Sequence, residues 1–355
     1  MKSPLAQTIE AVPFIQTKEI KKHYKNAKNQ VLAVDGVDVT IFQGETLGLV
    51  GESGCGKSTL GRVIVGLETA TSGEIFYQNR SLGTMKGKER KNIRKEIQMI
   101  FQDPYSALNP RKTVGDILRA PLLYHGLSTK KQVDQDIFRL LDQVGLSKRS
   151  MNRYPHEFSG GQRQRICIAQ ALSLNPKVII CDEPVSALDV SIQAQILNLL
   201  KELQKEHDLT YLFIAHGLGA ISYISDRVAV MYLGKIVEIA PTMEIFTRPL
   251  HPYTQALYSA APVSSPHQRE ENKRILLQGE AQQPEGEKGC KFYHRCPYRM
   301  EKCKLAHPSL VQVEGWELDH QVACYYALET FKRKTRPQKD DVTKHSQYQQ
   351  GGQDV

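Results

Sequence analysis

The stretch that decides the fold is Gly51-Glu52-Ser53-Gly54-Cys55-Gly56-Lys57-Ser58-Thr59, which fits the phosphate-loop pattern G-x-x-x-x-G-K-[ST] at every fixed position. The glycines let backbone N–H groups turn inward, and the helix expected from Lys57 onward adds the positive end of its dipole. We therefore predict a site for a nucleotide triphosphate, in which Lys57 neutralises the β- and γ-phosphates and Ser58 ligates Mg²⁺. A strand-like run at 46–50 and an apolar helical run at 60–67 argue against a chance match.

Composition limits the function classes that the chain can belong to. Its 355 residues suggest about two domains, and its formal charge is +9. The basic clusters at 18–28, 86–95 and 331–339 are short, separate and without interleaved aromatics, which favours a solvated surface over a nucleic-acid groove. Apolar runs fall far short of the roughly 20 residues that a membrane span needs. Residues 1–10 lack the apolar segment of a secretory signal, so we expect a cytoplasmic protein.

Periodicity along the chain indicates an α/β fold. Loose apolar alternation from Ile20 to Gly51 predicts antiparallel strands ahead of the phosphate loop. Residues 110–157 carry helical spacing and predict an inserted helical subdomain. Ser159 is a plausible N-cap for the next helix, which we expect to end near Leu174 before Asn175-Pro176.

Polar residues follow several predicted strands, where ligands of α/β sheets gather. Gln102 comes after the strand at 97–101, and Asp182-Glu183 ends the buried strand at 177–181. Two adjacent carboxylates at that position are costly unless they have a function. His216 follows the strand at 210–214; a histidine seen by itself is more often a satisfied core residue.

The order of these motifs resembles that of the ATP-binding cassette (ABC) family over residues 18–265. The motifs are, in sequence, the phosphate loop, Gln102, the S-G-G-Q stretch at 159–162, Asp182-Glu183, Asp189 and His216. The S-G-G-Q stretch ahead of a D-E strand separates the chain from kinases and GTPases. The resemblance implies a phosphate-loop NTPase cassette: a mixed central sheet with an antiparallel β subdomain and an inserted helical subdomain at about 103–175.

The resemblance implies a site for ATP and Mg²⁺. In it, Glu183 is the base that polarises the attacking water, and His216 orients that water and the γ-phosphate. Mg²⁺ is held by Ser58, Gln102 and Asp182. The remaining nucleotide-binding positions are Tyr24, which stacks on adenine, and Gly51, Ser53, Gly54, Cys55, Gly56, Lys57 and Thr59.

The signature Ser159-Gly160-Gly161-Gln162 has a different role in the resemblance. It contacts the nucleotide of a partner cassette across a head-to-tail dimer, with Asp189 at the same interface. Two positions depart from the family pattern: Phe158 stands where leucine is commoner, and Gly217 follows His216 where aspartate is frequent. The first is a mild apolar exchange, whereas the second changes the loop and the expected hydrolysis rate.

Four of the seven cysteines lie together near the C-terminus: Cys290, Cys296, Cys303 and Cys324. In a reducing cytosol such a group indicates metal binding before disulfides. With the stretch 248–254, the group resembles the tail of dipeptide and oligopeptide importer ATP-binding subunits, and nickel importers of the same branch look similar. The C-x5-C-x6-C-x20-C spacing is not that of a C-x2-C zinc ribbon. Four thiolates suit either a 4Fe-4S cluster, favoured by the resemblance, or Zn²⁺, with four unliganded thiols as a third possibility.

The resemblance implies a transport ATPase peripheral to the cytoplasmic face of the cell membrane. Its expected partners are a second, non-identical cassette, two membrane permease subunits and a periplasmic or extracellular substrate-binding protein, with no nucleic acid. The alternatives are an importer of nickel or another small solute, a soluble ABC ATPase acting on nucleic acid, and a non-hydrolysing ATP sensor. The predicted division is a leader at 1–17, the cassette at 18–265, a linker at 266–289, the cysteine segment at 290–329 and a disordered tail at 330–355.

Overall fold

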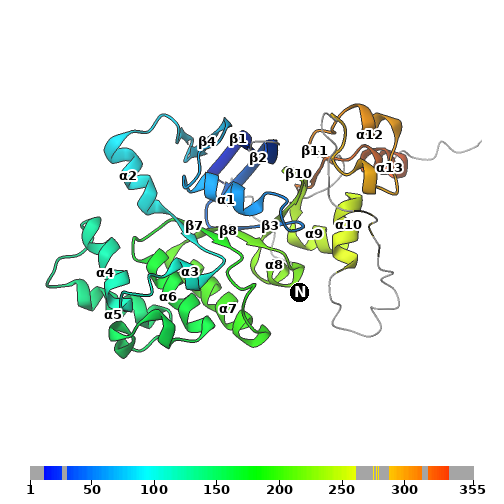
Figure 1. Cartoon of the computed structure of the whole chain (residues 1–355). Helices are drawn as coiled ribbons and strands as arrows, with labels where there is room; N and C mark the ends of the chain where they lie inside the picture. Colours follow the sequence, from blue (N-terminus) through cyan, green and yellow to red (C-terminus); the bar gives the residue numbers. More distant parts are fainter. Residues whose placement is uncertain are drawn as a thin grey trace, which may run out of the picture.

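The computed structural model describes residues 12–25, 30–260, 275, 277, 279, 288–313 and 319–335. In this part of the chain the strands form two sheets, and helix α1 (Lys57–Ile64) lies between them (Figure 1). The helices α3 (Pro104–Ala107), α4 (Val114–Tyr124), α5 (Val133–Gln143), α6 (Gly160–Leu172) and α7 (Val190–His207) gather on the other side of the larger sheet. The predicted mixed α/β cassette with an inserted helical subdomain is confirmed.

The larger sheet, as far as the described residues show it, has eight strands in the order β11-β12-β10-β9-β3-β8-β7-β6. Its parallel part comprises β9 (Arg227–Tyr232), β3 (Thr46–Val50), β8 (Thr210–Ala215), β7 (Val178–Asp182) and β6 (Ile97–Ile100). Parallel strands direct their carboxyl ends to one edge of the sheet. The phosphate loop, Gln102, Glu183 and His216 follow these ends and are brought to the same edge.

The central strands are continuous apolar runs because both faces of the sheet are covered. Along β7, Val178 and Ile180 belong to the core shared with α1 and the smaller sheet, whereas Ile179 and Cys181 belong to the core shared with the helical region. This alternation is the period of two of a β-strand. It fixes which way the strand end, and with it Asp182, faces.

The smaller sheet is antiparallel, with β1 (Pro13–Lys25) between β2 (Gln30–Phe42) and β4 (Ser72–Tyr77), and β5 (Arg80–Ser81) at one edge. Phe14 and Ile15 of β1 are buried in its core. The predicted leader at 1–17 therefore ends too late, because its last residues are part of a strand. Residues 1–11 lie outside the described part of the chain.

The described part of the cassette also contains α2 (Gly87–Glu96), α8 (Leu218–Ile224), α9 (Thr242–Thr247) and α10 (Pro252–Ser259). No helix in the described ranges is long and apolar enough to cross a membrane.

The C-terminal segment is joined to the cassette sheet. It contains a 3-10 turn at Tyr293–Arg295, α12 (Glu301–Leu305), β11 (Val311–Gln312), β12 (Gln321–Val322) and α13 (Tyr325–Thr335). Strand β12 pairs with β10 (Lys235–Pro241). The fully buried Glu238 of β10 accepts the N–H groups of Leu250 and His251 and lies 2.7 Å from His320 Nε2.

The predicted boundaries of the tail and of the linker can be compared with the described residues. The tail predicted to be disordered from 330 is helical to Thr335 in α13, and residues 336–355 lie outside the described part. Most of the predicted linker at 266–289 also lies outside it, as do residues 261–265 of the predicted cassette.

Candidate nucleotide site

Two glycines fix the path of the phosphate loop between β3 and α1. Gly56, directly before α1, has φ +108°, and a Cβ there would lie 1.9 Å from the carbonyl oxygen of Ala33 on β2. At Gly51 a Cβ would lie 2.1 Å from the carbonyl oxygen of Met231 on β9. No side chain fits at either distance, so the backbone of both neighbouring strands presses on the loop and requires glycine.

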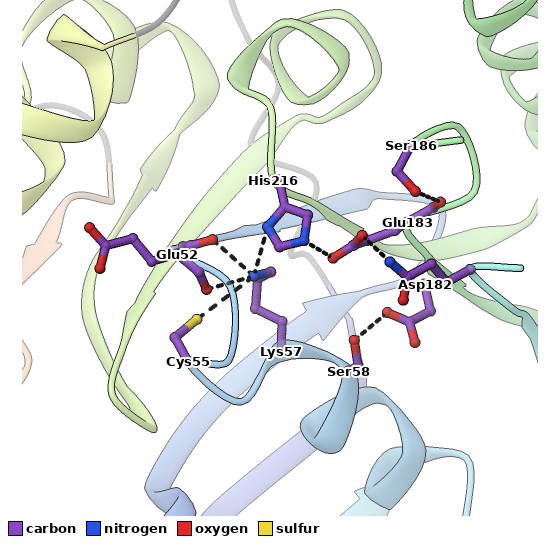
Figure 2. Close-up of polar contacts among 10 residues, drawn as sticks. Glu52, Cys55, Lys57, Ser58, Asp182, Glu183, Ser186 and His216 are labelled. Atoms are coloured by element: carbon purple, nitrogen blue, oxygen red, sulfur yellow. Dashed lines mark hydrogen bonds and ion pairs between the residues drawn. The ribbon is translucent and has the colours of Figure 1, made fainter. Parts of the chain in front are cut away.

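Lys57 places a buried ammonium group inside this loop. Its Nζ donates to the carbonyl oxygens of Gly51 at 2.9 Å and Glu52 at 3.0 Å, and lies 3.5 Å from His216 Nδ1 (Figure 2). The residue is 3% exposed, and within the described ranges it has no carboxylate at ion-pair distance. A buried cation without an anion is unfavourable, so this position suits an anionic ligand such as a phosphate.

Ser58 and Asp182 meet at the start of α1. The Ser58 hydroxyl donates to Asp182 Oδ1 at 2.7 Å, and Asp182 is 1% exposed at the end of β7. Its second oxygen, Oδ2, is buried and has no hydrogen-bond partner among the described residues. An unsatisfied buried carboxylate oxygen beside a hydroxyl fits a hydrated Mg²⁺, which is usually held by one or two carboxylates together with substrate phosphates.

Glu183 holds the centre of a second cluster. Its Oε2 accepts from the Gln102 amide at 2.7 Å, and its Oε1 lies 2.5 Å from His216 Nε2. The residue is 4% exposed and has φ +48°, a left-handed backbone that is rare for a residue other than glycine. Such strained residues concentrate at functional sites. A carboxylate held by an amide and an imidazole in this way can orient and polarise a water molecule.

Most of the predicted nucleotide-contacting residues line one cavity of about 180 Å³. Its lining includes Ala33, Ser53, Gly54, Gly56, Lys57, Ser58, Thr59, Gln102, Glu183 and His216. The structure thus brings together residues from both ends of the cassette sequence. Cys55 lies just behind the cavity, with its Sγ 3.8 Å from Lys57 Nζ, and burial raises the pKa of this thiol.

Tyr24 stands outside that cavity. Its hydroxyl donates to Glu68, and the ammonium of Lys22 lies 5.1 Å from its ring centroid. Tyr24 is 37% exposed. Its stacking role stays a prediction.

The signature lies apart from the chain's own phosphate loop. Ser159 caps α6: its hydroxyl accepts the N–H of Gln162 at 3.3 Å, and its own N–H donates to Gln162 Oε1 at 3.1 Å. A Cβ on Gly161 would lie 2.5 Å from Ile192 of α7, which explains that glycine. Ser159 and Asp189, the residue before α7, are exposed and absent from the lining of the cavity. The open helix N-terminus suits an anion brought by another molecule.

The four C-terminal cysteines line one pocket and are all free thiols. Burial raises the pKa of Cys290 to about 12 and that of Cys324 to about 11, so both are neutral at physiological pH. No three His, Cys, Asp or Glu side chains of the described chain are placed to hold a metal ion. The four thiols thus share one pocket but are not arranged as a ligand set in the described residues.

Two contacts to the phosphate loop come from residues that the sequence did not single out. The Tyr253 hydroxyl of α10 accepts the N–H of Glu52, and Arg295 of the cysteine segment pairs with the Glu52 carboxylate. Tyr253 belongs to the His251-Pro252-Tyr253 stretch, which resembles the transporter family but did not predict the contact with Glu52. Arg295 carried no signal, because 243 residues separate it from its partner.

Two family models match the chain. The ABC transporter family matches residues 34–186, a range that contains the phosphate loop and the Asp182-Glu183 pair. The oligopeptide/dipeptide transporter C-terminal region matches residues 237–303, which contain Tyr253, Arg295 and three of the four cysteines. The two matches cover both sides of the contacts at Glu52 and the cassette core.

Relatives match over most of their length. The putative oligopeptide transport ATP-binding protein YkfD of Bacillus subtilis (strain 168) is 49% identical over 329 residues, 92% of this chain and 99% of that protein. The oligopeptide transport ATP-binding protein OppF of Salmonella typhimurium is 50% identical over 310 residues, 86% of this chain and 91% of that protein. A dimeric post-hydrolysis structure of the ATP-binding cassette MJ0796 with ADP and Pi is similar with a TM-score of 0.59 and 29% identity, covering 64% of this chain and 98% of that one.

The packing around Gly56 predicts the effect of a single methyl group. Gly56→Ala should abolish measurable MgATP binding, because the methyl must displace either the loop or strand β2. The matched control is Gly66→Ala: Gly66 has φ +76° but open space around it, so only about 1 kcal/mol of backbone strain is expected. Equilibrium binding of a fluorescent ATP analogue checks both variants, and normal affinity in Gly56→Ala would contradict the geometry.

Proposed function

The chain belongs to the ATP-binding proteins of oligopeptide and dipeptide ABC transporters, and from this membership we propose that it hydrolyses ATP to energise uptake of di- and oligopeptides through partner membrane subunits. Peptides are proposed as the transported substrate because both relatives are named oligopeptide transport ATP-binding proteins. One observation carries hydrolysis itself: the Glu183 carboxylate, fixed between Gln102 and His216, faces the cavity of the phosphate loop.

The residues of the site divide the work of phosphoryl transfer to water. Lys57 holds the β- and γ-phosphates within the N–H groups of the loop, and this neutralises charge that would otherwise repel an attacking oxygen. Glu183 accepts a proton from the water, while His216 and Gln102 keep its carboxylate directed at the cavity. Ser58, Gln102 and Asp182 would hold Mg²⁺, which would neutralise charge on the nucleotide phosphates when it is bound.

The site is half of a composite one in this proposal. The N-terminus of α6, with Ser159 to Gln162, would close over the nucleotide of a partner cassette, and a partner's signature would close over Lys57. Three observations support this: Ser159, Gly160 and Gln162 are exposed, the signature lies outside the lining of the chain's own cavity, and the similar cassette MJ0796 has a dimeric structure with ADP and Pi. ATP would then hold two cassettes together, and hydrolysis would release them.

The partners follow from the same proposal. A non-identical second cassette would complete the pair, two permease subunits would form the channel, and a periplasmic or extracellular binding protein would deliver the peptide. The chain would act at the cytoplasmic face of the cell membrane as a peripheral subunit.

The four C-terminal cysteines are proposed as ligands of a 4Fe-4S cluster, with Zn²⁺ as the alternative. Their shared pocket and their number support this. Binding the cluster would require all four thiols to lose their protons. Burial raises the pKa of two of them, Cys290 and Cys324, in the chain without the cluster. No step of ATP hydrolysis depends on it.

Glu183→Gln should lower the ATPase rate of the assembled transporter by at least about 100-fold, because the amide cannot take the proton from water. MgATP should still bind, since Gln keeps the size of the side chain and Lys57 is untouched. Steady-state phosphate release and nucleotide binding are measured together. Glu206→Gln, on the exposed face of α7, serves as the control with normal turnover, and undiminished turnover in Glu183→Gln would remove Glu183 from the mechanism.

Anaerobic purification decides the cysteine proposal. A visible absorption spectrum together with about four irons and four sulfides per chain is the expected result for Cys290, Cys296, Cys303 and Cys324. Changing Cys296 to Ser should lower the iron content, whereas Cys167→Ser should leave it unchanged because Cys167 is buried in the helical core. One equivalent of zinc without iron would refute the cluster, and a metal-free chain would refute both ligands.

A further inference from the structure

Glu52 is an acidic side chain within a loop that receives phosphates. Its carbonyl oxygen accepts from Lys57, so the residue itself is part of the cradle. A free carboxylate at this point would repel a nucleotide triphosphate through the low-dielectric wall of the site. Figure 2 shows the Glu52 carboxylate pointing away from Lys57, toward the outside of the cluster.

Arg295 holds the Glu52 carboxylate in that orientation. Its Nη1 lies 2.8 Å from Oε2 and its Nη2 lies 3.0 Å from Oε1, a two-bond pairing of guanidinium and carboxylate. The Arg295 side chain is only 10% exposed, and it also donates to the Tyr232 hydroxyl at 3.3 Å. The hydrogen bonds to Glu52 raise the pKa of Arg295 above its ordinary value. The pair is bidentate and partly buried, with the Arg295 side chain 10% and the Glu52 side chain 32% exposed, so it differs from a fully exposed surface salt bridge.

A second contact fixes the backbone of the same residue. The Tyr253 hydroxyl accepts the Glu52 N–H at 2.8 Å, and Tyr253 is fully buried. Its ring packs against Tyr232 and against Phe292 of the cysteine segment, with centroids 4.7 Å and 5.6 Å apart. The side chain and the backbone of Glu52 are therefore both held from the C-terminal part of the chain.

The loop between Cys290 and Cys296 provides Arg295, which pairs with Glu52, and Phe292, whose ring packs on Tyr253. Lys291 donates to the carbonyl oxygen of Leu233 at 2.7 Å and pairs with Asp35 at 2.9 Å, on the same strand as Ala33, which touches Gly56. Phe292 joins the aromatic cluster, and Arg295 reaches Glu52. The two cysteines that end the loop line the cysteine pocket on its other side. One short loop thus joins that pocket to the phosphate loop.

We propose that the loop from Cys290 to Cys296 positions the phosphate loop through Arg295, so that the C-terminal segment sets the affinity of the site for nucleoside triphosphate. Arg295 is a positioning residue: it acts on the nucleotide through Glu52. The proposal rests on ATP binding at Lys57, as proposed above. Because coupling between two parts of a protein is reciprocal, nucleotide at the loop must also stabilise the segment that holds it.

Binding measurements on the full chain test the first half. Arg295→Gln should weaken MgATP binding about tenfold, the range of a directly coupled charged pair, and Arg295→Lys should weaken it less because one hydrogen bond remains. Lys302→Gln is the matched control, since Lys302 lies on the same segment and pairs with Glu329 instead. In the assembled transporter Arg295→Gln should raise the KM for ATP about tenfold with little change in kcat.

A second substitution separates charge from folding. Glu52→Gln in the Arg295→Gln background should restore part of the lost affinity, because it removes the carboxylate that Arg295 no longer holds away from the phosphates. A purely structural role of Arg295 predicts no such rescue. Circular dichroism and thermal unfolding check that each variant is folded. If Arg295→Gln does not fold, the test uses Arg295→Lys and the double variant.

Hydrogen exchange measures the reciprocal effect. A non-hydrolysable ATP analogue should slow amide exchange in residues 289–300 of the wild-type chain, and this protection should be lost in Arg295→Gln. Equal affinity in Arg295→Gln and wild type, an equal loss in Lys302→Gln, or no protection at 289–300 would each overturn the proposal. A wild-type chain that binds no MgATP would instead count against the proposed function.

Discussion

The buried ammonium group of Lys57 is the constraint on which the rest of the structure depends. Lys57 is 3% exposed, and its described partners are two carbonyl oxygens, a thiol and an imidazole. No carboxylate is among these described partners. Desolvating a cation in this way costs several kcal/mol unless an anion compensates it. The loop is thus built for a ligand with several negative charges. Gly51 and Gly56, pressed by the carbonyls of β9 and β2, keep it in that shape.

The parallel sheet supplies the chemistry around this cation. Strands β6, β7 and β8 end at one edge, and each is followed by one polar group: Gln102, Glu183 or His216. Glu183 contacts both Gln102 and His216, so a carboxylate that would be costly by itself has a partner at each of its two oxygens. The arrangement places the Glu183 carboxylate and the Lys57 ammonium in the lining of one cavity. Ser159, which is exposed, does not line this cavity.

Local patterns predicted the parts of this site that depend on local chemistry. The phosphate loop, the carboxylates that end β7 and the cap at Ser159 are recognisable because glycine, buried carboxylates and N-caps are each demanded by a few neighbouring residues. The contact of Arg295 with Glu52 had no such signal, since it joins two side chains far apart in the sequence and depends on the tertiary packing of the C-terminal segment on the cassette. The pairing of β12 with β10 also joins residues far apart in the sequence, which is why the sequence predicted the C-terminal segment to be separate from the cassette. The strand residues before 17 and the helix to Thr335 were missed because short amphipathic pieces resemble linkers until they are packed.

The composite nature of the site is tested most directly by measuring ATP binding and ATP turnover of the full chain over a range of concentrations, alone and in the assembled transporter. The isolated chain should bind MgATP saturably at Lys57, yet turn it over slowly at every concentration at which it is monomeric. Turnover per chain should rise when the second cassette and the membrane subunits are added, because only then does a signature close over the phosphates. A dilute monomer that hydrolyses ATP as fast as the assembled complex would contradict the division of the site between two chains.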